Sequence, residues 1–173
     1  MTHDELVIIA ERWLLNSKGG GCGVVFRELT AYTDTGEIPD ALGFSSWYSV
    51  LVECKVSRSD FLSDRKKHFR KIPENGMGVF RYYMCTAGLI APEELPSKWG
   101  LIYVGEKGKA KVIVDALGPN GWRSRSPNIH EHNHKAERSM MYSALRRLTL
   151  RGRISEIYDQ PWKQPAPTDQ EKE

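Results

Sequence analysis

The chain has 173 residues, of which 40% are hydrophobic, 10% aromatic and 27% charged. This composition is typical of one globular domain with a hydrophobic core, and it excludes a chain that is disordered throughout. The 25 basic and 22 acidic side chains give a formal net charge of only +3. Any surface that binds a polyanion must therefore be local rather than global.

The cysteines and the N-terminal stretch indicate where the protein resides. Cys22, Cys54 and Cys85 are odd in number and form no C-x-x-C pair, which is typical of reduced core thiols in a cytosolic protein. Glu11 and Arg12 interrupt the N-terminal apolar stretch, unlike a secretory signal, and no run approaches the roughly 20 apolar residues of a membrane span. We expect a cytoplasmic protein without a membrane partner.

The first part of the chain predicts one helix and three extended segments. Over residues 2–16 the apolar residues recur at helical spacing, and Thr2 precedes Glu5 as a capping box. Strand-like runs then occupy 22–29, 37–44 and 47–56, of which the last is the most apolar.

A second helix is predicted from Ser57 to about Lys71, because Ser57 precedes Asp60 as a start signal and Pro73 stops it. It should pack Phe61, Leu62 and Phe69 against the core.

The remaining segments complete the predicted order. Strands are predicted at 76–90, 99–105 and 110–117, a loop at 118–128 and a helix at about 130–151. The alternation of helices and strands predicts an α/β fold. We expect one domain over residues 1–160 and a charged, Pro- and Gln-containing tail over 161–173, which should be flexible.

An acid and a base lie two residues apart on the most apolar strand. Because side chains alternate between the faces of a strand, Glu53 and Lys55 share one face with Leu51. Burying two such charges costs several kcal/mol each, and even a well-formed buried ion pair is often no better than two apolar residues. Stability is therefore a poor reason to keep the pair.

Asp40, on the preceding extended segment, is a candidate for a second carboxylate beside Glu53. A hairpin between the two runs would bring its carboxylate beside Glu53. Magnesium prefers oxygen ligands, often one or two carboxylates with waters and substrate phosphate. Lys55 would then stabilise the transition state or help to deprotonate the attacking water. The pattern favours phosphodiester hydrolysis with Mg²⁺ or Mn²⁺.

The "PD" of Pro39 and Asp40, followed by "ECK" at residues 53–55 after an apolar strand, resembles the PD-(D/E)XK nuclease superfamily. The resemblance implies a mixed central β-sheet flanked by helices with a restriction-endonuclease-like core. It also implies that Asp40 and Glu53 bind the metal and that Lys55 assists catalysis. DNA is the implied substrate, with RNA left open, and a homodimer is compatible because many nucleases of this fold act as dimers.

A narrower resemblance covers about residues 22–105. Within the superfamily, "KVSRSDFLSDRKKHF" resembles the K-x-S-x-x-D-F-x-x-D-x-K arrangement of the MmcB-like bacterial DNA repair proteins. The matching positions are Lys55, Ser57, Asp60, Phe61, Asp64 and Lys66. The resemblance also implies that Glu28 is a further acidic residue that orients the metal or its water, although Glu5 or Glu11 on the first helix would serve as well. DNA repair, recombination and the processing of phage or mobile-element DNA all remain open as roles.

The segment from Lys55 to Lys71 is strongly basic, with seven Lys or Arg against two Asp. Such a surface suits the phosphate backbone beside a scissile bond, where contacts give salt-dependent and sequence-independent affinity. A loop with two further arginines would form a second clamp. The predicted nucleic-acid contacts are Arg58, Arg65, Lys66, Lys67, Arg70, Arg123 and Arg125.

Other interpretations of the same residues stay open. Glu53 and Lys55 would form a plain buried salt bridge if Asp40 only ends a turn. A nuclease fold without catalysis would make a nucleic-acid-binding or inhibitory module. His130 and His134 would share a helical face that suits zinc or nickel, yet no further ligand stands at a fixed spacing, which favours a polar start of the helix.

Overall fold

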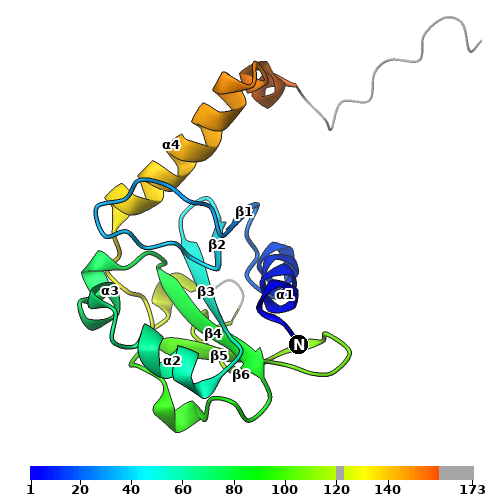
Figure 1. Cartoon of the computed structure of the whole chain (residues 1–173), viewed down its shortest axis with the longest axis vertical. Helices are drawn as coiled ribbons and strands as arrows, with labels where there is room; N and C mark the ends of the chain where they lie inside the picture. The colour runs from blue at the N-terminus through cyan, green and yellow to red at the C-terminus, as the bar shows by residue number, and fades with distance from the viewer. Residues whose placement is uncertain (120–122, 160–173) are drawn as a thin grey trace, which may run out of the picture. The chain divides into compact units, whose positions relative to one another are not determined.

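The computed structural model describes residues 1–119 and 123–159 (Figure 1). The chain divides into two compact units, residues 1–140 and 141–173. The sheet and the helices that cover it belong to the first unit. The described part of the second unit comprises the end of α4 (His134–Leu150) and the 3-10 turn η4 (Ile154–Tyr158). The tail predicted over 161–173 lies outside the described residues.

The first helix, α1 (His3–Leu15), confirms the capping box predicted from the sequence. The hydroxyl of Thr2 accepts a hydrogen bond from the Glu5 backbone N–H at 3.3 Å, and the Glu5 carboxylate accepts one from the Thr2 N–H at 2.7 Å. These two bonds satisfy N–H groups that the first turn of any helix leaves without partners. They fix the direction in which α1 and its first residue, His3, enter the fold.

A six-stranded mixed sheet forms the centre of the first unit, with its strands in sequence order. The strands are β1 (Val24–Arg27), β2 (Ala41–Phe44), β3 (Ser49–Lys55), β4 (Phe80–Thr86), β5 (Trp99–Val104) and β6 (Ala110–Val114). β2 is antiparallel to β1 and to β3, β4 is parallel to β3 and to β5, and β6 is antiparallel to β5. All six strands fall within segments predicted as extended.

Helices cover both faces of this sheet (Figure 1). One face carries Val50 and Val52 of β3 and packs against α1 through Leu6 and Leu14. The other face carries Leu51 and packs against α2 (Arg58–Asp64) and the start of α4. Two-sided coverage explains why β3 is buried along its whole length. The α/β fold with a mixed sheet between helices follows directly from this arrangement.

The basic segment after β3 differs from the single helix that the sequence predicts. It forms two short helices, α2 (Arg58–Asp64) and α3 (His68–Lys71), because Lys67 has an extended backbone with ψ of 141°. Ser57 caps α2 as predicted, with its hydroxyl accepting from the Asp60 N–H at 3.2 Å. Phe61 and Phe69 are buried, whereas Leu62 is 45% exposed, so its predicted packing is wrong.

Short 3-10 turns lie in the connections between the parallel strands and in the loop before the last helix. The 3-10 turns η1 (Pro73–Asn75) and η2 (Pro92–Glu94) lie in the two crossovers between parallel strands. The loop predicted at 118–128 contains the 3-10 turn η3 (Arg123–Arg125), and helix α4 begins four residues later than predicted. Across residues 1–119 and 123–159, every helix is too short or too polar to span a bilayer.

Candidate active site

The β2–β3 hairpin places Asp40 next to the end of β3. Ala41 pairs with Val52 in the antiparallel register, so that Asp40, one residue earlier, lies level with Glu53. The Oδ2 atom of Asp40 accepts a hydrogen bond from the Cys54 backbone N–H at 2.7 Å. Its side chain is 17% exposed. The hairpin predicted from the sequence therefore does bring Asp40 to the charged end of β3.

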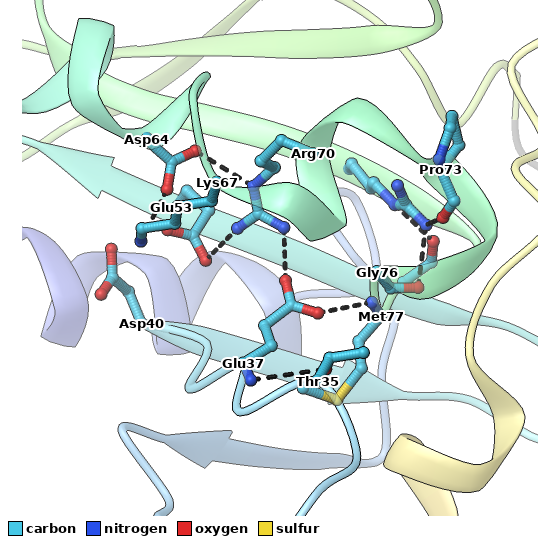
Figure 2. A network of polar contacts seen from close by, with 12 residues as sticks. Thr35, Glu37, Asp40, Glu53, Asp64, Lys67, Arg70, Pro73, Gly76 and Met77 are labelled. Carbon is cyan, nitrogen blue, oxygen red and sulfur yellow. Dashed lines mark hydrogen bonds and ion pairs between the residues drawn. The ribbon is translucent and has the colours of Figure 1, made fainter.

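Glu53 and Lys55 lie on the same face of β3, and both are buried. The Lys55 ammonium lies 3.1 Å from Glu53 Oε2 and 3.9 Å from Asp40 Oδ2. Two carboxylates and one ammonium thus converge where the strand ends, as Figure 2 shows for the two carboxylates. The structure brings together the three side chains on which the sequence interpretation depends.

Lys55 keeps its proton in this environment. Burial by itself would lower the pKa of the ammonium, but the negative charges of Glu53, Asp64 and Asp40 outweigh burial and raise the pKa above its ordinary value. A permanently charged ammonium is a poor base and a good source of positive charge. Lys55 is therefore suited to stabilising developing negative charge, and it is not suited to deprotonating water.

Asp40 carries the charge that a metal ion would neutralise. Burial, and then the negative charge of Glu53, raise the pKa of the Asp40 carboxyl to about 6, against the opposing effects of Lys55 and the Cys54 N–H. A raised pKa means that the ionised carboxylate is poorly compensated where it lies. A divalent cation beside Asp40 would remove this imbalance, and the oxygen ligands present fit Mg²⁺ or Mn²⁺.

Two further side chains approach Asp40 from other elements. His3 Nε2 lies 3.3 Å from Asp40 Oδ1, and His3 Nδ1 lies 3.7 Å from Glu28 Oε1. Among the described residues, these three offer ligand atoms that all lie within 4.8 Å of one another. Glu28 therefore does reach the site, while Glu5 and Glu11 are not members of this group.

The backbone of Glu28 is held in an unusual conformation. Its φ of 45° lies in the left-handed region, which costs a residue with a side chain roughly 1–2 kcal/mol. The Glu28 N–H donates to the Asp40 carbonyl oxygen at 3.1 Å, which ties the end of β1 to the residue before β2. Sequence reasoning missed His3, because nothing in a helix-start pattern distinguishes a histidine that faces a site from one that faces solvent.

Arg70 is the centre of a buried charge network, and its prediction as a nucleic-acid contact needs correction. Its side chain is only 3% exposed. The guanidinium forms an ion pair with Glu37, lies 2.8 Å from Glu53 Oε1 and donates to Asp64 Oδ2 at 3.0 Å (Figure 2). Glu37 also accepts from the Met77 N–H at 2.7 Å. A guanidinium enclosed by three carboxylates is inaccessible to a phosphate group.

Asp64 is the most strongly stabilised anion of this network. Its Oδ2 atom also accepts from the Tyr83 hydroxyl at 2.8 Å, and Lys67 Nζ lies 2.9 Å from Oδ1. Burial alone would raise the pKa of Asp64, but Arg70 and Lys55 lower it far below the ordinary value. The sequence does not indicate that Asp64 is buried in this network, because the pattern of charges along a short helix does not distinguish a buried carboxylate from an exposed one.

The other predicted nucleic-acid contacts on this segment are exposed but differ in their partners. Arg58 forms a two-pronged pair with Glu94, with N–O distances of 2.6 and 2.5 Å, so its charge is largely neutralised. Arg65 lies over the Phe61 ring, 5.7 Å from its centroid. Arg65, Lys66 and Lys67 are all exposed, and of these Lys67 also pairs with Asp64 at 2.9 Å.

The predicted arginine clamp lies at the opposite end of β3. Arg123 donates to the carbonyl oxygens of Gly20 at 2.9 Å and Gly19 at 3.1 Å and bonds the Tyr48 hydroxyl. Tyr48 precedes β3 and Lys55 ends it, which separates the two regions by about 20 Å along the strand. Arg123 thus joins its own turn to the turn after α1, far from Asp40, and Arg125 is an exposed residue of the same 3-10 turn.

The histidines before α4 serve the fold. His130 is buried, and burial lowers its pKa to about 4, so the imidazole is neutral. His132 Nε2 lies 3.5 Å from the carboxylate of the buried Glu137, which accepts hydrogen bonds from Ser49 and Gly78. Within the described part of the chain, no group of metal ligands includes His130, His132 or His134.

Comparisons with known proteins add a likeness of fold. No protein-family model and no curated protein sequence matches the chain. A solved structure of a protein of unknown function from Silicibacter pomeroyi is similar to it, with a TM-score of 0.55 and 18% sequence identity. The similarity covers 94% of this chain and 98% of that one. At this identity, the likeness concerns the fold alone.

Proposed function

We propose that the chain is a divalent-metal-dependent nuclease that hydrolyses DNA phosphodiester bonds and has a PD-(D/E)XK-like core. The observation that carries the proposal is the convergence of Asp40, Glu53 and Lys55 at the end of the β2–β3 hairpin. An uncompensated carboxylate beside a protonated lysine is a combination that phosphoryl chemistry uses and that stability alone does not favour.

Under this proposal, different residues bind the metal ion, stabilise the transition state and bind the DNA backbone. Asp40 and Glu53 would hold Mg²⁺ or Mn²⁺, with Glu28 and His3 next to them. The ion, when bound, would polarise the phosphodiester and lower the pKa of a water nucleophile. The Lys55 ammonium would balance negative charge on the phosphoryl oxygens as the bond to the leaving oxygen breaks. Arg65, Lys66 and Lys67 would hold the phosphate backbone alongside.

Cleavage assays test this function directly. We expect the protein to cut DNA in the presence of Mg²⁺ or Mn²⁺ and to be inactive in EDTA. Single-stranded, duplex, nicked and branched DNA should all be tried, together with RNA, and a Lys55→Met variant serves as the matched inactive control. If the folded protein binds Mn²⁺ yet leaves every substrate intact, the proposal is wrong.

One observation favours the alternative, a nuclease-fold module that binds nucleic acid without cutting it. Both carboxylate oxygens of Glu53 already face cations, Oε1 facing Arg70 and Oε2 facing Lys55. A non-catalytic module would bind DNA with an affinity that neither EDTA nor Glu53→Gln changes. The cleavage assay and this binding assay together separate the two functions.

The exposed cations predict a salt-dependent DNA affinity. Replacing Arg65 and Lys66 together by Gln should weaken binding equally for unrelated sequences and flatten the plot of log affinity against log salt by about one unit per lost phosphate contact. The measurement is fluorescence anisotropy of labelled DNA in EDTA. Lys107→Gln with Lys109→Gln, in the exposed β5–β6 turn, is the matched control and should leave the slope unchanged.

A further inference from the structure

The Lys55 ammonium is surrounded by more negative charge than one cation needs. Four carboxylates lie within 4 Å of Nζ: Glu53 at 3.1 Å, Asp64 at 3.6 Å, Asp40 at 3.9 Å and Asp60 at 3.9 Å. The first and third of these are the residues that would hold a divalent ion under the proposed function. A cation placed there would take two of the ammonium's partners and would repel the ammonium itself.

If a divalent ion occupies Asp40 and Glu53, Asp64 and Asp60 are the carboxylates that still face Lys55. These two side chains differ in their exposure to solvent. Asp60 is 40% exposed, so that water screens its charge. The Asp64 side chain is fully buried, and its Oδ2 atom is fixed by the Tyr83 hydroxyl and by Arg70 Nε. Its Oδ1 atom faces Lys55 from the side of α2 rather than from β2. Lys67, whose side chain is 47% exposed, also lies 2.9 Å from this Oδ1 atom. Asp64 is therefore a buried anion, fixed through its other oxygen, that lies within reach of both the Lys55 and the Lys67 ammonium groups.

We propose that Asp64 is the positioning residue of Lys55, and that it retains the ammonium at the site when a divalent ion occupies Asp40 and Glu53. The inference rests on the proposed function and extends it. With Asp64 in place, the metal ion and the ammonium occupy the site together. Without Asp64, the ammonium has its best remaining partners in Asp40 and Glu53, where it competes with the ion.

A double-mutant cycle on metal affinity tests this without any need for catalysis. Mn²⁺ is titrated by calorimetry into the full-length wild type, Asp64→Asn, Lys55→Met and the double variant. Because Lys55 competes more strongly for Asp40 and Glu53 when Asp64 is lost, we expect Asp64→Asn to weaken Mn²⁺ binding about tenfold in the wild type and less than about threefold in the Lys55→Met background. An equal loss in both backgrounds overturns the proposal, as does the absence of Mn²⁺ binding by the wild type.

Two controls separate positioning from folding. Asp60→Asn is the matched change on the same helix and should alter Mn²⁺ affinity less than about twofold, since its charge is screened. Tyr83→Phe removes a hydrogen bond to Asp64 but keeps the carboxylate charge, so it too should leave affinity nearly unchanged. A tenfold loss with Tyr83→Phe would show that packing around Asp64 matters instead of its charge, and would overturn the assignment.

If the Asp64→Asn variant does not fold, an NMR measurement on the wild-type protein tests the proposal instead. In protein labelled with ¹⁵N at lysine, the Lys55 ammonium resonance, assigned by its loss in Lys55→Met, should persist when Mg²⁺ saturates the site. Its disappearance through fast exchange with water would overturn the proposal. If Mn²⁺ binds and the cycle behaves as expected but no DNA is cut, the nuclease function fails while the role of Asp64 stands.

Discussion

Asp40→Asn should abolish metal-dependent cleavage and at the same time stabilise the folded protein at neutral pH. The loss of activity should reach about a thousandfold or more, because a metal ion contributes several kcal/mol of transition-state stabilisation and each 1.36 kcal/mol is a factor of ten in rate. Asparagine keeps an oxygen that accepts the Cys54 N–H, so the hairpin geometry is retained.

The gain in stability follows from the raised pKa of Asp40. Folding raises this pKa from 3.8 to about 6, so the folded state binds the proton more tightly and stability falls as pH rises between these values. Above about pH 6 the full penalty is present, and at 1.36 kcal/mol per pKa unit it amounts to roughly 3 kcal/mol. The neutral asparagine avoids this penalty.

Urea unfolding in EDTA at two pH values measures the effect. At pH 7.5 the Asp40→Asn variant should be more stable than the wild type by about 2–3 kcal/mol, and near pH 3.5 the difference should vanish. Asp60→Asn, at a more exposed carboxylate, is the control and should change stability little at either pH. A variant that is less stable than the wild type at pH 7.5 would show that Asp40 serves the fold.

Arg70→Met should cause the largest loss of stability of any single change in the basic segment. The substitution leaves Glu37, Glu53 and Asp64 buried without their common cation, and removing one partner of a buried ion pair typically costs about 3–5 kcal/mol. The same change at Arg65, which is exposed and lies over Phe61, should cost no more than about 0.5 kcal/mol.

Thermal and urea unfolding of the two variants distinguish the roles assigned to the two arginines. Adding Glu37→Gln to Arg70→Met should recover part of the lost stability, because it removes one of the carboxylates left without a counter-ion. If instead Arg70→Met folds normally and loses only DNA affinity, the burial of Arg70 is not maintained in solution and the original interpretation as a phosphate contact applies.

The convergence of Asp40, Glu53 and Lys55 was predictable because it depends on local rules. Alternation along β3 places Glu53 and Lys55 on one face, and the short connection from Asp40 to β3 favours a hairpin. Both rules act over a few residues, so neither neighbouring helices nor distant loops alter their outcome. Ser57 as the cap of α2 is predictable for the same reason.

The surroundings of the site were not predictable, because they depend on tertiary packing. A lysine-rich sequence gives no indication that the backbone leaves the helical region at Lys67, nor that the next turn directs Arg70 inward. Glu37 begins a segment predicted as extended, and no local pattern indicates that the Met77 N–H from a distant segment holds its carboxylate in the core. His3 reaches Asp40 only because α1 packs on the sheet at that end.

The central place of β3 has a consequence for redesign. The strand has no free edge, since β2 and β4 bond both of its sides, and no exposed face. Changes within it would disturb two neighbouring strands and two layers of core at once. The exposed positions of the following segment, such as Lys66, lie outside the sheet and its core. Under the proposed function, new substrate preferences should therefore be sought by exchanging those positions while the strand is kept intact.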